Sequence, residues 1–170
     1  RGSVQADPRP SLTLPTVPAK PRTSVDVTKY LFMHMVGEPS QVYDLTGVVG
    51  EGGFGTVSSA VHRKTGQTHA VKSVPKDKVH SNELWAEIEI MKQLDHPHVV
   101  RLYHSFEDEE NIYIASELCT GGAFFEILSD GGPLGERNAL RMFGQMSSVI
   151  SYLHNNNICH RDIKPENMLL

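Results

Sequence analysis

A glycine-rich segment between two stretches of β-branched residues is the feature that most restricts how this chain can fold. Residues 50–57 read Gly-Glu-Gly-Gly-Phe-Gly-Thr-Val and fit the pattern G-x-G-x-x-G-x-V. Glycines allow backbone N–H groups to approach phosphate oxygens without an intervening side chain. A dinucleotide-binding fold has similar glycine spacing but starts a helix at the third glycine, whereas residues 56–61 here are strand-like. The segment therefore predicts a strand–loop–strand phosphate site, although a purely structural turn also fits the motif taken alone.

The composition excludes several broad classes of protein. The chain has 170 residues and a net charge of −4, and it contains no apolar run near the roughly 18–20 residues of a transmembrane helix. The mild acidity argues against a nucleic-acid-binding protein, which normally carries a concentrated basic surface. Two cysteines, Cys119 and Cys159, are too few for a disulfide scaffold and fit a reducing compartment. We therefore expect a cytoplasmic protein with no transmembrane segment and no nucleic-acid partner.

The distribution of proline divides the chain into two parts. Five of the ten prolines lie in residues 1–25, together with several Ser and Thr residues. Such a segment buries too little apolar surface to offset the entropy of ordering it. We expect residues 1–42 to be a disordered leader and linker, and residues 43–170 to form a folded domain.

Hydrophobic periodicity in the second part predicts short strands followed by helices. Runs rich in β-branched and aromatic residues alternate with turns, and two segments have helical period instead. The predicted strands are residues 43–49, 55–62, 68–74, 99–106 and 111–117, and the predicted helices are residues 81–94 and 135–155. Five strands with one inserted helix, followed by helices, make an α+β arrangement.

A lysine in the third predicted strand stands where an apolar residue is expected. Lys72 shares one face of that strand with Ala70, because side chains alternate between the two faces. It is either an ordinary exposed lysine or a partner for nucleotide phosphates and for a carboxylate on the following helix. Glu87 has helical spacing with Leu84 and Met91 on the inward face, which makes it the predicted ion-pair partner of Lys72.

The most specific signal is a polar run in residues 158–170 that has apolar residues on both sides. Residues 160–167 read His-Arg-Asp-Ile-Lys-Pro-Glu-Asn and match H-R-D-x-K-x-x-N in full. A polar surface loop explains the composition but not the apolar flanks. Phosphoryl transfer needs a carboxylate that orients a hydroxyl and accepts its proton, a cation near the transferred phosphate, and a metal ligand. Asp162, Lys164 and Asn167 supply these three groups.

Together these segments resemble the eukaryotic protein kinase family over residues 43–170, in the order and approximate spacing that the family uses. The resemblance implies a protein-kinase-like fold: a five-stranded antiparallel N-lobe with one helix (residues 43–118) and a partial C-lobe (residues 119–170). It also implies ATP and Mg²⁺ as cofactors. Lys164, two residues after Asp162, is similar to the serine/threonine type, so the implied partners are proteins with Ser or Thr acceptors.

The resemblance further implies a role for each matching residue. Lys72 would contact the α- and β-phosphates with Glu87 as its partner. Asp162 would be the catalytic base, Lys164 the γ-phosphate contact and Asn167 a Mg²⁺ ligand. Backbone groups of Glu117 and Cys119 would hold the adenine. The implied cofactor-binding residues are Val49, Gly50, Glu51, Gly52, Gly53, Phe54, Gly55, Thr56, Val57, Ala70, Lys72, Ser116, Glu117, Cys119, Glu166, Asn167 and Leu169.

Within that family the sequence is most similar to calcium-dependent protein kinases of the calmodulin-kinase group. Residues 50–58, 89–97 and 117–122 carry this similarity. The chain has no D-x-[DN]-x-[DN]-G loop, so we expect calcium sensing only through regions absent from it. It also ends before any D-F-G segment, so we expect a fragment with little phosphotransfer of its own. The alternative is an inactive kinase-like fragment that binds nucleotide or partners without turnover.

Two positions depart from the family pattern. Ala123 stands where relatives usually have a glutamate that contacts ribose and often a basic substrate residue, so an arginine-directed substrate preference is not expected. Ser116 stands in front of the implied adenine pocket, where a bulkier side chain is usual, so we expect a deeper pocket that accepts enlarged adenine mimics. The helix over residues 135–155 should expose apolar side chains, among them Leu140 and Phe143, which predicts poor solubility and marginal stability for this chain.

Overall fold

The computed structural model describes residues 32–53, 55–132 and 134–170. These residues fall into two compact units, residues 32–119 and residues 120–170, and each is described by itself. Of the predicted leader, residues 1–31 lie outside the described residues, so their predicted disorder stays a prediction. In the described part, no helix is long and apolar enough to cross a membrane.

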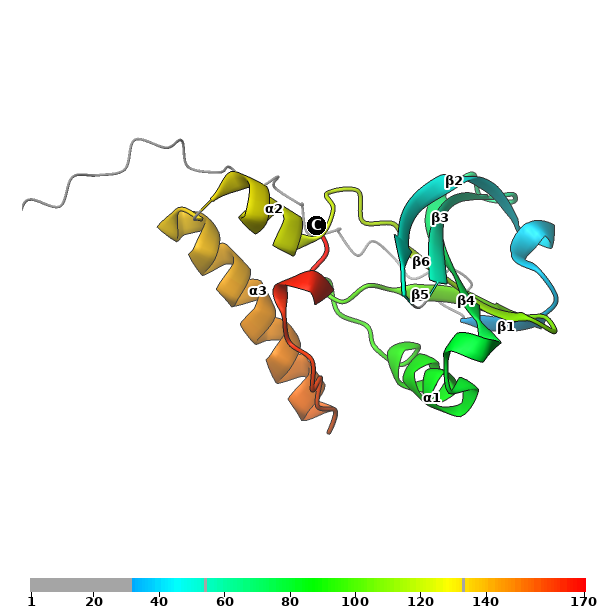
Figure 1. Ribbon diagram of the computed structural model, residues 1–170. Helices are drawn as coiled ribbons and strands as arrows, with labels where there is room; N and C mark the ends of the chain where they lie inside the picture. The colour runs from blue at the N-terminus through cyan, green and yellow to red at the C-terminus, as the bar shows by residue number, and fades with distance from the viewer. Residues whose placement is uncertain (1–31, 54, 133) are drawn as a thin grey trace, which may run out of the picture. The chain divides into compact units, whose positions relative to one another are not determined.

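The first unit is built on a twisted sheet with one helix (Figure 1). Among the described residues the sheet has six strands in the order β1-β5-β6-β4-β3-β2. The strands are β1 (Met33–Val36), β2 (Tyr43–Gly52), β3 (Gly55–His62), β4 (Thr68–Pro75), β5 (Leu102–Glu107) and β6 (Asn111–Glu117). Short 3-10 turns cover Pro39–Gln41 (η2) and Lys76–Lys78 (η3). The five strands from β2 to β6 confirm the predicted pattern of strands, with small shifts at their ends.

The first strand corrects two expectations. Residues 33–36 belong to the predicted leader, yet they form β1, which pairs with β5 in parallel, His34 opposite Ser105. The sheet therefore has six strands and is not wholly antiparallel. The physical reason is that β5 would otherwise be an edge strand whose backbone N–H and C=O groups lack partners, and an extended segment can supply them.

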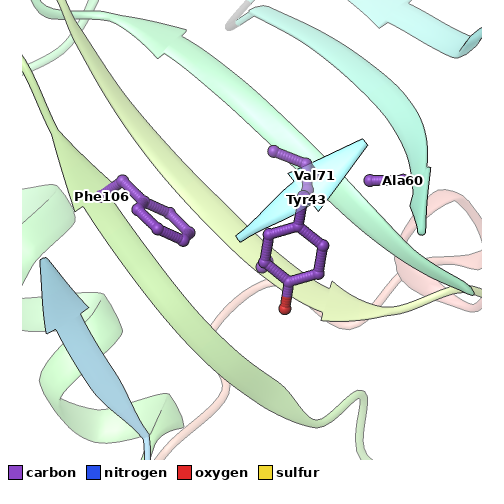
Figure 2. Packing of buried hydrophobic residues seen from close by; sticks show 5 residues of the cluster. Tyr43, Ala60, Val71 and Phe106 are labelled. Atoms are coloured by element: carbon purple, nitrogen blue, oxygen red, sulfur yellow. The ribbon is translucent and has the colours of Figure 1, made fainter. Parts of the chain in front are cut away.

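The two faces of the sheet support different clusters of side chains. On one face, Tyr43, Val71 and Phe106 pack together with two alanines, Ala60 and Ala115, and Figure 2 labels all of these but Ala115. On the other face, Ile88 of α1 (Ser81–Met91) packs against Leu102 and Ile112. Alternation along β6 separates Ala115 from Ile112 and Ile114, because neighbouring residues of one strand point to opposite faces. In β5, the register shift between Leu102 and His104 puts Leu102 and Phe106 on different faces.

Helix α1 is shorter than predicted. The sequence pattern extends to residue 94, but the helix ends at Met91 and continues as a tight turn in which the Gln93 N–H donates to the Ile90 carbonyl and the Leu94 N–H to the Met91 carbonyl. The loop before β5 then starts within a few residues.

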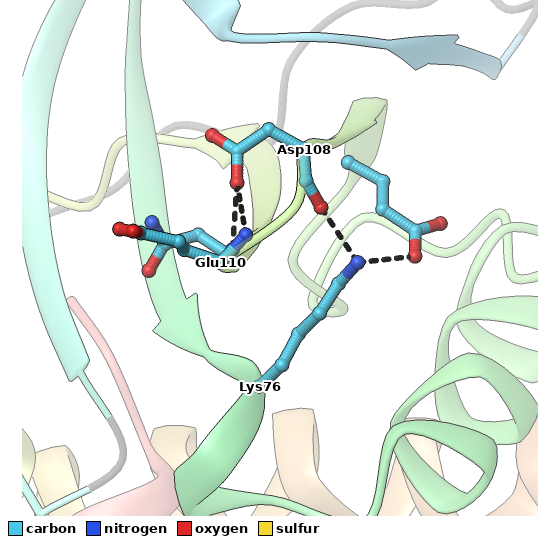
Figure 3. Close-up of polar contacts among 5 residues, drawn as sticks. Lys76, Asp108 and Glu110 are labelled. Carbon is cyan, nitrogen blue, oxygen red and sulfur yellow. Dashed lines mark hydrogen bonds and ion pairs between the residues drawn. The ribbon is translucent and has the colours of Figure 1, made fainter.

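The turn between β5 and β6 is fixed by polar contacts (Figure 3). The Lys76 ammonium lies 2.7 Å from a Glu107 carboxylate oxygen and donates to the Asp108 carbonyl at 2.6 Å. The Asp108 carboxylate accepts from the backbone N–H groups of Glu110 and Asn111. These hydrogen bonds hold the pKa of Asp108 below its usual value, the Asn111 bond contributing most.

The second unit contains α2 (Phe124–Gly131), α3 (Glu136–Asn155) and the 3-10 turn η4 (Pro165–Asn167). Its core contains Phe124 and Met142, against which Leu134, Met168 and Leu170 pack. Helix α3 confirms the predicted helix over residues 135–155 to within one residue. The expected apolar exposure is also present, because Leu140 is 66% and Phe143 65% exposed.

Candidate nucleotide and phosphotransfer site

The predicted site residues divide between the two units. The glycine-rich segment, Lys72, Glu87 and residues 116–119 belong to the first unit, and residues 160–169 belong to the second. Each group is described within its own unit.

The glycine-rich segment is the hairpin between β2 and β3. Gly50 pairs with Val57, Glu51 with Thr56 and Gly52 with Gly55. Gly53 lies in the turn, and Phe54 lies outside the described residues. The strand–loop–strand geometry predicted from the β-branched residues after the glycines is thus confirmed.

The glycines of this hairpin differ in whether the fold would accept a side chain at their positions. Gly55 has φ +135°, and a Cβ on it would lie 1.9 Å from the Ser73 carbonyl oxygen, so the fold itself requires glycine there. Gly50, Gly52 and Gly53 have no such φ, and a Cβ on them would meet no described atom within 4 Å. A structural turn therefore explains Gly55 but leaves the other three unexplained. Their bare backbone is instead open to a ligand, as close approach to phosphate requires.

Lys72 lies next to the end of the glycine-rich segment. In the sheet it stands between Val57 of β3 and Ile114 of β6. Residues directly opposite each other point to the same face, as do residues two apart in one strand. Val57, Ala70, Lys72 and Ser116 therefore share one face, with Ala70 directly opposite Ser116. This is the face against which α1 packs, since Ile114 contacts the cluster around Ile88.

Glu87 is not where the pattern placed it. The buried face of α1 is centred on Ile88, which is 1% exposed, and Glu87 is exposed at the edge of that face. Among the ion pairs of the described residues, none joins Lys72 to Glu87. The expected inward orientation is therefore wrong for this structure, and the pair itself stays a prediction.

The segment after β6 begins within the sheet. The Glu117 N–H donates to the Arg101 carbonyl at 2.9 Å. Cys119 is half-buried, and neither it nor Cys159 is joined in a disulfide. The predicted adenine contacts are the backbone groups of Glu117 and Cys119, and they stay a prediction.

In the second unit, Asp162, Lys164 and Asn167 meet. One carboxylate oxygen of Asp162, Oδ2, lies 2.8 Å from the Lys164 ammonium and accepts a 2.9 Å hydrogen bond from the Asn167 amide nitrogen. The same amide nitrogen donates to the Asp162 backbone carbonyl at 2.8 Å. Within the described residues, the other carboxylate oxygen, Oδ1, and the Asn167 amide oxygen accept no hydrogen bond. The three predicted side chains are thus brought together with one acceptor oxygen left on each of two residues.

The electrostatics of this group follow from those contacts. Hydrogen bonds from Lys164 and then from Asn167 hold the pKa of Asp162 below its usual value, so the carboxylate is ionised at neutral pH. The bond to Asp162 raises the pKa of Lys164, which keeps the ammonium protonated. Arg161 has φ +63°, a left-handed conformation that costs a non-glycine residue about 1 kcal/mol or more. The backbone strain therefore lies directly beside the ionised carboxylate.

Gly121 is a residue of this region that the sequence reasoning did not select. The Gly121 N–H donates to the Leu170 carbonyl at 2.6 Å, and the Leu170 N–H donates to the Gly122 carbonyl at 3.1 Å. A Cβ at Gly121 would lie 2.7 Å from the Leu170 backbone. Leu169 forms a bridge with Ala123 and is half exposed. The signal available in the sequence was the adjacent glycine pair, whose second member has φ +78°.

The comparisons with known proteins agree with this geometry. The family model for the protein kinase domain matches residues 43–170. Calcium-dependent protein kinase 5 of Plasmodium falciparum is 43% identical over 134 residues, covering 78% of this chain and 24% of that protein. Human NUAK family SNF1-like kinase 1 is 34% identical over 167 residues, covering 96% of this chain and 25% of that protein.

A solved structure gives the same result for the fold. The crystal structure of Rad53 residues 1–466 in complex with AMP-PNP has a TM-score of 0.74 and 36% sequence identity, covering 77% of this chain and 36% of that one. The chain spans about a quarter of the length of the curated relatives described above. The predicted protein-kinase-like α+β fold is confirmed, and the chain belongs to the protein kinase family.

Proposed function

We propose that this chain carries the nucleotide-binding and catalytic-loop portion of an ATP- and Mg²⁺-dependent serine/threonine protein kinase. The observation that carries the proposal is the joint contact of Lys164 and Asn167 with one oxygen of Asp162, which leaves its other oxygen available. The relatives whose names include protein kinase, and the structural neighbour whose title includes AMP-PNP, support it.

Asp162 would act on the acceptor hydroxyl. With Oδ2 held by Lys164 and Asn167, the ionised carboxylate presents Oδ1 at a fixed orientation to a Ser or Thr hydroxyl of a protein substrate. That oxygen would orient the hydroxyl and accept its proton as the bond to phosphorus forms. Lys164 would contact the transferred γ-phosphoryl group and stabilise its charge.

The donor set also fits a magnesium ion. Mg²⁺ prefers oxygen ligands in proteins, and the Asn167 amide oxygen accepts no hydrogen bond in the described part of the chain. Asn167 would hold Mg²⁺ through that oxygen, and the bound ion would neutralise phosphate charge. Glu166 lies in the same turn, η4, next to Asn167, and its side chain is exposed.

The first unit would bind the nucleotide. Backbone N–H groups of the open glycines Gly50, Gly52 and Gly53 would approach the phosphates, and Lys72 would neutralise the α- and β-phosphates with Glu87 as its partner. The adenine would lie against Val57 and Ala70, with backbone contacts at Glu117 and Cys119.

We propose calcium control for the whole protein, not for this chain. Relatives named calcium-dependent protein kinases support this proposal, whereas the present sequence contains no calcium-binding loop of the pattern D-x-[DN]-x-[DN]-G. The cysteine content supports a cytoplasmic location.

Mg-ATP binding by this chain tests the proposal directly. Isothermal titration should show binding by the parent chain and a loss of at least tenfold in affinity for Lys72→Met. Lys64→Met is the matched control, because Lys64 is an exposed lysine in the β3–β4 turn of the same sheet. Equal affinities for the parent chain, Lys72→Met and Lys64→Met, or no binding at all, would overturn the proposed nucleotide site.

A further inference from the structure

The segment that precedes β2 contacts α1, the helix that carries Glu87. We call residues 32–37 the strap. Phe32 packs against the cluster of Ile88, Leu102 and Ile112, to which Leu84, Trp85 and Met91 also contribute. The strap therefore contributes an aromatic side chain to the interface between α1 and the sheet.

His34 makes a second contact between the strap and α1. Its ring lies edge-to-face with the ring of Trp85, with centroids 4.9 Å apart and planes at 89°. Its Nδ1 atom is hydrogen-bonded to the Ser105 hydroxyl at 2.9 Å, and Ser105 is fully buried. His34 thus joins the helix to β5 through one side chain.

The two ends of the strap are held as well. At one end, the Lys92 ammonium lies 6.0 Å from the centre of the Phe32 ring. At the other end, the Gly37 N–H donates to the Glu107 carbonyl at 2.7 Å, and Gly37 has φ +107°, which favours glycine. Glu107 is itself held by its ion pair with Lys76.

Helix α1 depends on such contacts. It has eleven residues, and isolated helices shorter than about 12–15 residues are marginal in water. Packing against the sheet and the strap must therefore supply its stability. The cluster that Phe32 joins also includes Ile114, which stands directly opposite Lys72 in the sheet. A continuous set of contacts therefore leads from the strap through α1 to the strand beside Lys72.

We propose that the strap is a positioning element for phosphate binding, with Phe32 and His34 as positioning residues. They hold α1 against the face of the sheet that carries Lys72, and so determine how closely Glu87 can approach Lys72. The inference rests on the proposed function, because it takes Lys72 and Glu87 as the working pair.

A double-mutant cycle with Glu87 tests the inference. Phe32→Ala and His34→Ala should each weaken Mg-ATP binding about fivefold or more when Glu87 is present. In a Glu87→Gln background the same substitutions should change the affinity less than about twofold, because the group that the strap positions has been removed. Phe32→Leu, which keeps an apolar anchor, should restore most of the affinity.

Met33→Ala is the matched control. Met33 belongs to the same strand, but it is 51% exposed and is not part of the cluster around Ile88. Emission of Trp85, the single tryptophan of the chain, gives a second measurement without nucleotide. It should shift to longer wavelength in Phe32→Ala and His34→Ala as the ring becomes hydrated, and stay unchanged in Met33→Ala.

The failures of the two proposals can be distinguished. If the parent chain binds Mg-ATP and Lys72→Met does not, but Phe32→Ala and His34→Ala bind like the parent, the strap inference is wrong. Equal losses in the Glu87 and Glu87→Gln backgrounds would also overturn it, since they indicate general destabilisation. If Lys72→Met binds like the parent, the proposed nucleotide site is wrong, and the strap inference is rejected with it.

Discussion

The Tyr43 hydroxyl is hydrogen-bonded to Nδ1 of His104 at 2.6 Å, and to Nδ1 of His69 at 2.9 Å, inside the first unit. A hydroxyl has one proton, so in this arrangement it donates to one imidazole and accepts from the other. Burial, and then the neighbouring His62 and His69, lower the pKa of His104 to about 4. Burial in this cluster therefore favours the neutral imidazole of His104.

The first prediction concerns pH and stability. The pKa of His104 is about 4 in the folded chain and near its ordinary value of 6.5 when unfolded, so the unfolded state binds more protons between these values. The free energy of unfolding should therefore be highest above about pH 6.5 and fall as the pH drops towards about 4. Urea unfolding at several pH values measures this.

Substitution of His104 isolates its contribution. His104→Gln should flatten the pH dependence between pH 4 and 6.5, whereas His154→Gln, at an exposed position near the end of α3, should leave it unchanged. The same slope in all three chains would show that His104 does not titrate as described.

The second prediction separates the glycines of the β2–β3 hairpin. Gly55→Ala must place a Cβ against the Ser73 carbonyl oxygen at a left-handed φ, so it should lower the free energy of unfolding by more than about 2 kcal/mol. Gly52→Ala meets no described atom and should change stability by less than about 1 kcal/mol. Its Mg-ATP affinity should nevertheless fall. Denaturation and titration of the same two variants check both halves, and a Gly52→Ala chain that binds like the parent would contradict the phosphate role.

The third prediction concerns the role of Asp162 in phosphotransfer. Asp162→Asn should reduce phosphotransfer by about 10²- to 10⁴-fold, because the group that orients the hydroxyl and accepts its proton is lost. Mg-ATP affinity should change less than about threefold. Asp77→Asn, at an exposed aspartate in η3, is the control for loss of a carboxylate. Undiminished turnover of Asp162→Asn would remove Asp162 from the mechanism.

The fourth prediction concerns the depth of the nucleotide pocket. Ser116 is a small residue directly opposite Ala70 on the face that carries Lys72. A purine analogue enlarged at its exocyclic nitrogen should therefore bind the parent chain at least tenfold more tightly than Ser116→Met, while the ATP affinities of the two chains stay similar. Competition against Mg-ATP measures the difference, and equal binding of the analogue would show that Ser116 does not limit the pocket.

The fifth prediction concerns the exposed face of α3. Leu140 and Phe143 are both about two-thirds exposed, and adjacent exposed apolar side chains promote association. The chain should self-associate in a concentration-dependent way, and the double substitution Leu140→Gln and Phe143→Gln should reduce this. Light scattering measures it, and unfolding of the double variant should occur at a similar denaturant concentration. A parent chain that stays monomeric would contradict the prediction.

Local patterns predicted most of the fold and the contact group of Asp162, Lys164 and Asn167. Alternation over residues 43–117 identified five strands because each buries one face within a few residues of sequence. Asp162, Lys164 and Asn167 meet as expected because they are separated by at most five residues. Such contacts depend on the geometry of a few neighbouring residues, so a short sequence motif can predict them.

The features that the sequence did not predict depend on contacts between distant residues or on the exact orientation of a side chain. Strand β1 has four residues and pairs with a strand about 70 positions later. The periodicity of a short segment does not predict such a distant pairing. Glu87 was misplaced because neighbouring residues of a helix are separated by about 100°, so the pattern did not distinguish the edge of the buried face from its centre. Gly121 was missed because the backbone that excludes a side chain there belongs to Leu170.

The pairing of Gly121 with Leu170 closes a chain segment into a loop whose ends are tied by backbone hydrogen bonds. The entropic cost of closing a loop grows slowly, by about 0.6 kcal/mol for each doubling of the loop length. Insertions between α2 and α3 should therefore be tolerated during evolution, while the closing contact has no room for a side chain larger than hydrogen. The segment that carries the proposed catalytic residues thus stays anchored even where the chain between Gly121 and Leu170 varies in length.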